Sequence, residues 1–152
     1  MALKKASRSA QRLLVQEFTF SFSDTAVDSV SGATKDFGVT VAGNLVFDAI
    51  NMPQGAVVCG GELIVETAGV GPTVYTAKLG VAGDDACFLA ASDLLAAVNT
   101  RYPLLLTKQL AANDAKNLRL TMASTVAAAT AGKFRLRVMF TIDGKSEEVI
   151  PN

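Results

Sequence analysis

Few residues of this chain have the types and spacing needed for chemistry. Asp84 and Asp85 are adjacent, and Asp93 follows further along the chain. Carboxylate oxygens in loops bind hard cations such as Ca²⁺. The spacing matches no EF-hand loop, so we favour a turn that ends a strand, followed by the first acidic residue of a helix. A metal-dependent enzyme that uses these three aspartates is the minor hypothesis.

The composition excludes most other catalytic chemistry. The chain has no His and no Trp, so it lacks the usual general base and the commonest metal ligand. Without His, no Ser or Cys has the partner that would activate it as a nucleophile. Gly60 and Gly61 lie inside a predicted strand rather than at a strand-to-helix junction, so they do not form a phosphate loop. We expect no enzymatic activity, no cofactor and no metal.

The two cysteines fit a structural interpretation. Cys59 and Cys87 are separated by 28 positions, which is not a CxxC spacing. Such thiols most often behave as small buried hydrophobic side chains. A disulfide between them is left open, because it depends on their distance in space.

The charges are balanced, with 14 basic and 14 acidic side chains. This balance gives no field that attracts nucleic acid or a membrane surface, and no apolar run has the length of a membrane helix. Arg119, Arg135 and Arg137 are the exception, because they can form a positive strip on an outward sheet face. A solvated polar face explains these three arginines equally well, so we expect no direct contact with nucleic acid or membrane.

The N-terminus differs from the rest of the chain. Residues 1–16 contain Lys4, Lys5, Arg8 and Arg12 and no acidic residue. They include too few apolar positions to pack a helical face, and no apolar stretch typical of a secretory signal. We therefore predict synthesis in the cytoplasm and a basic N-terminal arm over residues 1–16, with a frayed terminus as the alternative. Residues 17–144 would form the folded domain and residues 145–152 a polar C-terminal tail.

Alternation of apolar and polar residues dominates the folded part. Phe18, Phe20 and Phe22 alternate with polar residues, and a second alternation at Phe37, Val39 and Val41 follows a turn-rich stretch over residues 23–35. Further strands are predicted at residues 45–49, 56–67, 74–81, 118–122 and 133–142. The glycine pair in the second of these predicts a bulge or bend.

Two connections are predicted from local signals. Residues 69–72 contain Gly and Pro and predict a hairpin turn. Ser92 precedes a short run with Asp93 at its start, which predicts an N-capped helix over residues 93–98. The whole pattern is that of an all-β protein, an antiparallel β-sandwich or jelly roll with one short helical insertion and extended terminal arms.

Three blocks of this sequence resemble small virion proteins of tailed bacteriophages. The first runs from Met52 through Gly60-Gly61 to Thr67. The second joins Gly83-Asp84 to a segment at residues 88–94. The third covers residues 131–138 with Asp143-Gly144. The resemblance spans residues 52–144 and rests on strand and turn signatures rather than on a chemical site.

This resemblance implies a head decoration (cement) protein with a jelly-roll-like fold. Such a protein would bind the exterior of a capsid built from an HK97-type major capsid protein, bridge adjacent capsid subunits and act as a homodimer or homotrimer. The predicted partner-binding residues lie in the arm and the tail: Lys4, Lys5, Arg8, Arg12, Glu147, Glu148, Ile150 and Pro151. The alternative is a tail- or vertex-associated adhesion module that binds host carbohydrate.

Overall fold

The computed structural model describes residues 13–39, 44–106 and 116–142. Within these ranges the chain forms ten strands and no helix. The strands are β1 (Leu14–Ser21), β2 (Thr25–Val27), β3 (Thr34–Asp36), β4 (Leu45–Ile50), β5 (Ala56–Val70), β6 (Val74–Val81), β7 (Asp84–Asp93), β8 (Arg101–Pro103), β9 (Leu118–Thr125) and β10 (Ala131–Ile142).

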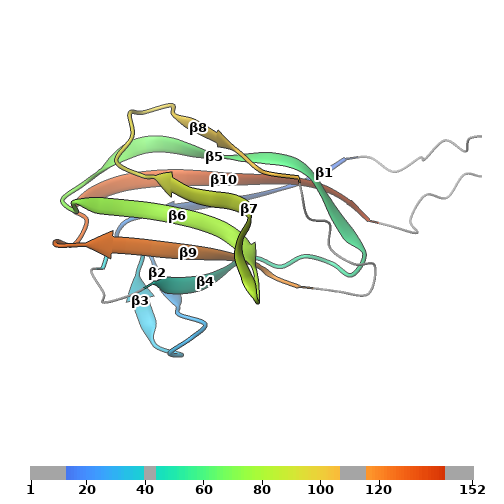
Figure 1. The fold of residues 1–152 in the computed structure, drawn as a ribbon, viewed down its shortest axis with the longest axis horizontal. Coiled ribbons are helices and arrows are strands. Elements are labelled where there is room, and N and C mark those ends of the chain that lie inside the picture. The colour runs from blue at the N-terminus through green and yellow to red at the C-terminus, as the bar shows by residue number, and fades with distance from the viewer. Residues whose placement is uncertain (1–12, 40–43, 107–115, 143–152) are drawn as a thin grey trace, which may run out of the picture.

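Two antiparallel sheets of four strands pack face to face, with a small β2–β3 hairpin beside them (Figure 1). The strand orders are β1-β10-β5-β8 in one sheet and β4-β9-β6-β7 in the other. With the hairpin set aside, eight strands remain, and they pair from the two ends of the chain inward. β1 pairs with β10, β4 with β9, β5 with β8 and β6 with β7. The predicted antiparallel β-sandwich is confirmed, and this nested pairing is the one found in jelly rolls.

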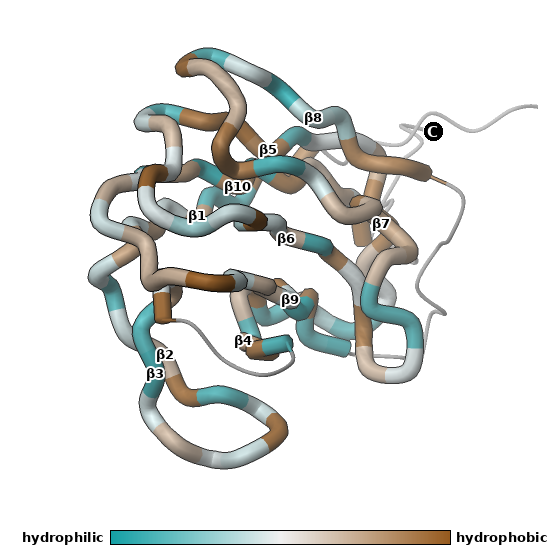
Figure 2. Tube along the Cα trace, turned by 60° about the vertical axis from the view of Figure 1, so that its left-hand side comes forward, coloured by the Kyte–Doolittle hydropathy of each residue, from teal (hydrophilic) through white to brown (hydrophobic). Residues whose placement is uncertain are grey.

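The core lies between the two sheets and is built by the predicted alternation. Along β10, Phe134, Leu136 and Val138 are fully buried, whereas Lys133 and Arg135 point outward. Hydrophobic and hydrophilic residues alternate along several strands in both layers (Figure 2). Period-two alternation gives each strand one buried face, and burial of that face holds the sheets together.

The first strand begins earlier than the phenylalanine alternation indicates. β1 starts at Leu14 and pairs with β10 in eight consecutive positions without a register shift. Residues 14–16, which the sequence places in the arm, therefore belong to the sheet. Leu14 lies opposite Phe140, so β1 begins and β10 ends at the same end of the sandwich (Figure 1).

The predicted hairpin at residues 69–72 is wrong. Gly71 has a positive φ of 113°, as expected for a turn, but β5 and β6 on either side of it belong to different sheets. The turn carries the chain across the sandwich. Turn-forming residues specify a local change of direction and do not specify which strands pair afterwards.

The predicted helix over residues 93–98 is also wrong. Asp93 ends β7, and its Oδ1 accepts a hydrogen bond of 2.9 Å from the amide of Leu95. This is the bond of an Asx turn, which resembles the start of a helix. The chain then returns to β5, where the amide of Asn99 donates to the carbonyl of Val65 at 2.8 Å. Pairing with the sheet therefore replaces the helix.

The turn-rich stretch over residues 23–35 folds into the β2–β3 hairpin, which is fastened to β4. The carboxylate of Asp28 accepts bonds from the Ser31 amide at 2.9 Å, the Ser31 hydroxyl at 2.6 Å and the Val46 amide at 2.9 Å. These bonds, the Ser31 hydroxyl foremost, lower the pKa of Asp28 to about 2. The strand expected from Phe37 onward is not formed at residues 37–39, and Val41 lies outside the described residues.

Candidate interaction surface

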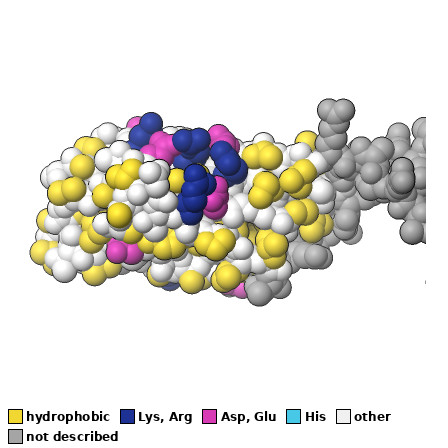
Figure 3. Space-filling model, turned by 90° about the horizontal axis from the view of Figure 1, so that it is seen from above, with side chains coloured by type: hydrophobic (Ala, Val, Ile, Leu, Met, Phe, Trp, Pro, Cys, Tyr) yellow, Lys and Arg dark blue, Asp and Glu magenta, His cyan; other side chains and the backbone are white. Residues whose placement is uncertain are grey.

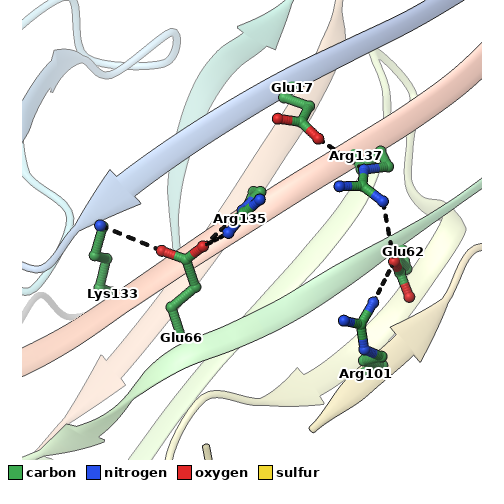
Figure 4. A network of polar contacts seen from close by, with 7 residues as sticks. All are labelled: Glu17, Glu62, Glu66, Arg101, Lys133, Arg135 and Arg137. Atoms are coloured by element: carbon green, nitrogen blue, oxygen red, sulfur yellow. Dashed lines mark hydrogen bonds and ion pairs between the residues drawn. The ribbon is translucent and has the colours of Figure 1, made fainter. Parts of the chain in front are cut away.

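Seven charged side chains form a layer on the outer face of the β1-β10-β5-β8 sheet, which we call the ionic layer (Figure 4). β10 lies between β1 and β5, and its outward positions supply the basic groups at the centre. The acidic groups come from the two neighbouring strands, and one further arginine comes from β8. The members are Glu17, Glu62, Glu66, Arg101, Lys133, Arg135 and Arg137.

Glu66 is the centre of one half of the ionic layer. It accepts hydrogen bonds from Nε of Arg135 at 2.6 Å and from Nη2 of the same side chain, and Lys133 Nζ lies 3.3 Å from its second oxygen. The bond from Arg135 is the main reason that the pKa of Glu66 is lowered, and partial burial opposes this shift. Arg135 donates twice to one oxygen and Lys133 lies beside the other, which makes this the most strongly held carboxylate of the layer.

The other half is a chain of alternating charges. Arg137 Nε donates to Glu17 at 2.7 Å on one side, and its Nη1 lies 3.7 Å from Glu62 on the other. Arg101 on β8 donates to the same oxygen of Glu62 at 2.6 Å. Four basic and three acidic groups thus neutralise one another almost completely across all four strands.

The positive strip considered for three arginines is not formed. Arg135 and Arg137 are paired with glutamates in the ionic layer, and Arg119 lies on β9 in the opposite sheet. There its Nε donates to Asp48 at 2.9 Å. A paired face of this kind has little attraction for phosphate groups. Glu62 and Glu66 occupy outward positions of the predicted strand over residues 56–67. The sequence pattern therefore indicates that these glutamates lie on a sheet surface, where they can pair with arginines.

The ionic layer is bordered by apolar surface (Figure 3). Ile64 is 5% exposed and is absent from the central core cluster, in contrast to its neighbours Leu63 and Val65. In the sheet register Ile64 lies between Arg135 on β10 and Arg101 on β8, and the methylene groups of arginine side chains commonly cover apolar area. At the start of β1, Leu13 and Val15 are each 51% exposed.

A groove of about 440 Å³ opens along the side of the sandwich where β1 and β4 are the edge strands. Aromatic side chains and two carboxylates line it together with residues of β2. The lining consists of Phe18, Thr19, Phe20, Asp24, Thr25, Ala26, Phe37, Phe47 and Asp48. The phenylalanines were predicted as core residues, but the sequence alone did not show that a groove would leave part of this cluster accessible.

The three aspartates first considered for metal binding do not form a site. Asp84 and Asp85 begin β7 instead of ending a strand, and Asp93 ends it, so the pair and Asp93 lie at opposite ends of an extended strand. Asp85 is paired with Lys78 at 3.1 Å. Within the described ranges, no group of three or more His, Cys, Asp or Glu side chains could hold a metal ion.

The remaining candidate residues are placed as follows. Cys59 is exposed and Cys87 is buried, and neither is in a disulfide. All ten aromatic residues lie in the described ranges, and each is buried or half-buried. No helix in the described part of the chain is long and apolar enough to cross a membrane. The predicted partner-binding residues of the arm and tail (Lys4, Lys5, Arg8, Arg12, Glu147, Glu148, Ile150 and Pro151) lie outside the described residues.

Comparison with known proteins finds similar folds among solved structures. No protein-family model and no curated protein matches the chain. A chain of the cyanophage Pam1 capsid asymmetric unit is similar over 93% of this chain and 92% of its own length, with 20% identity and a TM-score of 0.59. A chain of the acid-stable capsid of Helicobacter pylori bacteriophage KHP30 is similar over 85% and 90%, with 16% identity and a TM-score of 0.53. The chain therefore shares its fold, along nearly its whole length, with chains of two phage capsids.

Proposed function

We propose that this protein is a structural component of a tailed-phage virion, and specifically a decoration (cement) protein on the capsid exterior. The observation that carries this proposal is the fold shared over almost the full chain with chains of the Pam1 and KHP30 capsids. On this proposal the protein binds adjacent subunits of an HK97-type major capsid protein and bridges them. It is made in the host cytoplasm and acts without a cofactor.

The surface of the sandwich supports a role in contact rather than in catalysis. The described residues contain no cluster of metal ligands, and the ionic layer has almost no net charge. Sugar-binding sites commonly use exposed aromatic rings as platforms, and none of the aromatic residues here is exposed. These observations favour a protein partner over host carbohydrate.

The ends of the sandwich supply the means of bridging. β1 begins beside the end of β10, so the two terminal strands of the sandwich begin and end at the same end of it. We propose that the basic residues of the arm (Lys4, Lys5, Arg8 and Arg12) and Glu147, Glu148, Ile150 and Pro151 of the tail contact neighbouring subunits. Each contact adds interface that must be lost before the shell opens, which stabilises the shell.

The first experiment is sedimentation of purified virions on a density gradient. This chain is quantified in each fraction against the major shell protein. We expect comigration with intact particles at a fixed ratio near one copy per shell subunit. A few copies per particle would replace the cement role with a tail or vertex role, and recovery only as a small soluble species would overturn the virion proposal.

The second experiment tests the arm. Deletion of residues 1–12 removes Lys4, Lys5, Arg8 and Arg12 but leaves β1 intact, because that strand begins at Leu14. We expect lower occupancy on capsids with an unchanged melting temperature. Conversion of Lys4 and Lys5 to Arg preserves the charge and serves as the control, with normal occupancy. Normal occupancy of the deletion variant would contradict the role of the arm.

A further inference from the structure

β1 differs from the other edge strands because, in the described part of the chain, nothing protects its open side. It pairs regularly with β10 over eight positions and contains no Pro and no bulge. Its single charged residue, Glu17, already has Arg137 as a partner. Within the described ranges, no segment other than β10 forms backbone hydrogen bonds with residues 14–20. An edge strand of this kind is a template for pairing with another strand.

The other edges carry the features that prevent such pairing. β8 has three residues and ends in Pro103. β4 contains a register shift, and its Val46 is hydrogen-bonded to the Asp28 side chain and the Ser29 backbone. β7 begins with two aspartates, and the carbonyl of Phe88 on it accepts a bond of 2.7 Å from the Leu105 amide. Short length, Pro, bulges, charges and covering loops are the usual means of protecting an edge.

We propose that β1 is the docking edge for a second copy of this chain, and that two β1 strands pair antiparallel about a two-fold axis. The proposal goes beyond the capsid role, because it concerns association of the free protein and does not require a capsid. Edge-to-edge pairing about a two-fold axis joins the two β1-β10-β5-β8 sheets into one continuous sheet. It selects a dimer over the trimer that the sequence left open.

The charges of β1 restrict the register. When the two-fold axis is perpendicular to the sheet, even-numbered residues of one β1 lie opposite even-numbered residues of the other, and odd-numbered residues lie opposite odd-numbered ones. Side chains that face the core in one copy therefore lie beside those that face the core in the other, so both sandwiches lie on the same side of the joined sheet. A register with Glu17 opposite Glu17 of the second copy brings like charges together, which is unfavourable. A register with Gln16 on the two-fold axis places Val15 opposite Glu17 of the second copy. This register separates the two Glu17 carboxylates.

The same register fills the groove. Leu14 is 39% exposed and points to the same face of β1 as Phe18, which lines the groove. With Gln16 on the axis, Leu14 of the second copy lies opposite Phe18 and covers this aromatic surface. The groove thus matches the incoming strand in apolar character.

The first test is the mass of the full chain in solution by sedimentation velocity or light scattering. We expect a wild-type dimer with twice the mass of the 15.8 kDa chain. Val15→Glu places a carboxylate opposite Glu17 at two symmetric positions and should weaken the dimer about tenfold or more. Val15→Lys is the matched variant and should remain a dimer, because its ammonium lies opposite that glutamate. Val98→Glu changes an apolar residue of similar exposure away from β1 and is expected to have no effect.

The second test reads the register directly in a Cys59→Ser background, which removes the exposed thiol. Gln16→Cys should form a disulfide-linked dimer under mild oxidation, because the two positions lie opposite each other. Thr19→Cys should not, because residues 19 of the two copies would be about 20 Å apart along the strands. A monomeric wild-type protein, equal effects of Val15→Glu and Val15→Lys, or equal cross-linking at positions 16 and 19 would each overturn the proposal. None of these outcomes bears on binding of a monomer to a capsid, so the two proposals fail separately.

Discussion

The hydroxyl group of Tyr75 on β6 donates a hydrogen bond of 3.2 Å to the backbone carbonyl oxygen of Phe37, which follows β3. Tyr75 is fully buried, and this burial raises the pKa of its phenol, so the group remains a proton donor at neutral pH. Its ring also meets Phe134 of the other sheet edge-on, with ring centroids 5.7 Å apart. Tyr75 therefore links the segment after the β2–β3 hairpin to the core between the two sheets.

Replacement of Tyr75 by Phe should lower the free energy of unfolding by about 1–2 kcal/mol, because it leaves the buried Phe37 carbonyl without this donor. The ring contact with Phe134 is kept, so the change isolates the hydroxyl. Tyr102→Phe is the control. Its hydroxyl donates to the Asp93 carbonyl at 2.8 Å in an exposed position, and we expect a loss below about 0.5 kcal/mol. Urea denaturation of the three proteins measures both values, and equal losses would contradict this account.

The strands with strict alternation were predictable, because one face of each meets the core and the other meets solvent. β10 follows this rule, and the glycine pair on β5 does mark an irregularity. Met139 pairs with Gly60 and Phe140 pairs with Val58, which leaves Cys59 without an opposite residue. The sandwich architecture follows from such patterns, since each half-apolar strand needs a second layer to cover it.

The connections were not predictable, because local signals do not contain the tertiary competition that decides them. Asp93 makes the type of side-chain bond to the backbone that a helix start makes, yet the following residues pair with β5. Gly71 turns the chain in the predicted place, yet it connects two sheets. The ionic layer and the groove were missed for a related reason, since both depend on which strands become neighbours.

Removal of the charge of Glu66 should reduce stability in a pH-dependent way. Its pKa is lowered in the folded protein by the bond from Arg135, so its contribution is present above the pKa of the unfolded chain and is lost as the pH falls through the folded value. Glu66→Gln should therefore lower the free energy of unfolding by about 1 kcal/mol at pH 7, and the difference from wild type should shrink below about pH 4.

The control for Glu66 is Asp85→Asn, which removes one partner of the exposed pair with Lys78. We expect an effect near zero, because exposed pairs of this kind contribute little. Denaturant titrations at pH 7 and pH 3 compare the two variants with wild type. A loss in Glu66→Gln that does not change with pH would show that packing, and not charge, is responsible.

Asp28 should show a similar dependence at lower pH. Its folded pKa of about 2 lies below the value of about 3.9 for an unfolded aspartate. Its stabilisation is complete above about pH 5 and is lost progressively as the pH falls toward 2. Asp28→Asn leaves one of the donors from Ser31 or Val46 without its acceptor and should cost about 2 kcal/mol at pH 7. The gap to wild type should close between pH 4 and pH 2, and a constant gap would contradict the assigned pKa.

The two adjacent glycines of β5 should differ sharply in their tolerance of a side chain. Gly61 has a φ of 141°, and a Cβ there would lie 2.3 Å from the Arg137 carbonyl oxygen, which belongs to the backbone and cannot move freely. Gly60 has an ordinary φ, and its Cβ would meet only the Cε of Met139, at the flexible end of a side chain. Gly61→Ala should therefore lower the free energy of unfolding by about 3 kcal/mol or more, and Gly60→Ala by less than about 1 kcal/mol. Thermal and urea unfolding of the two variants measure this difference. Equal losses would mean that the bend in β5 does not depend on the close approach of β10 at Gly61.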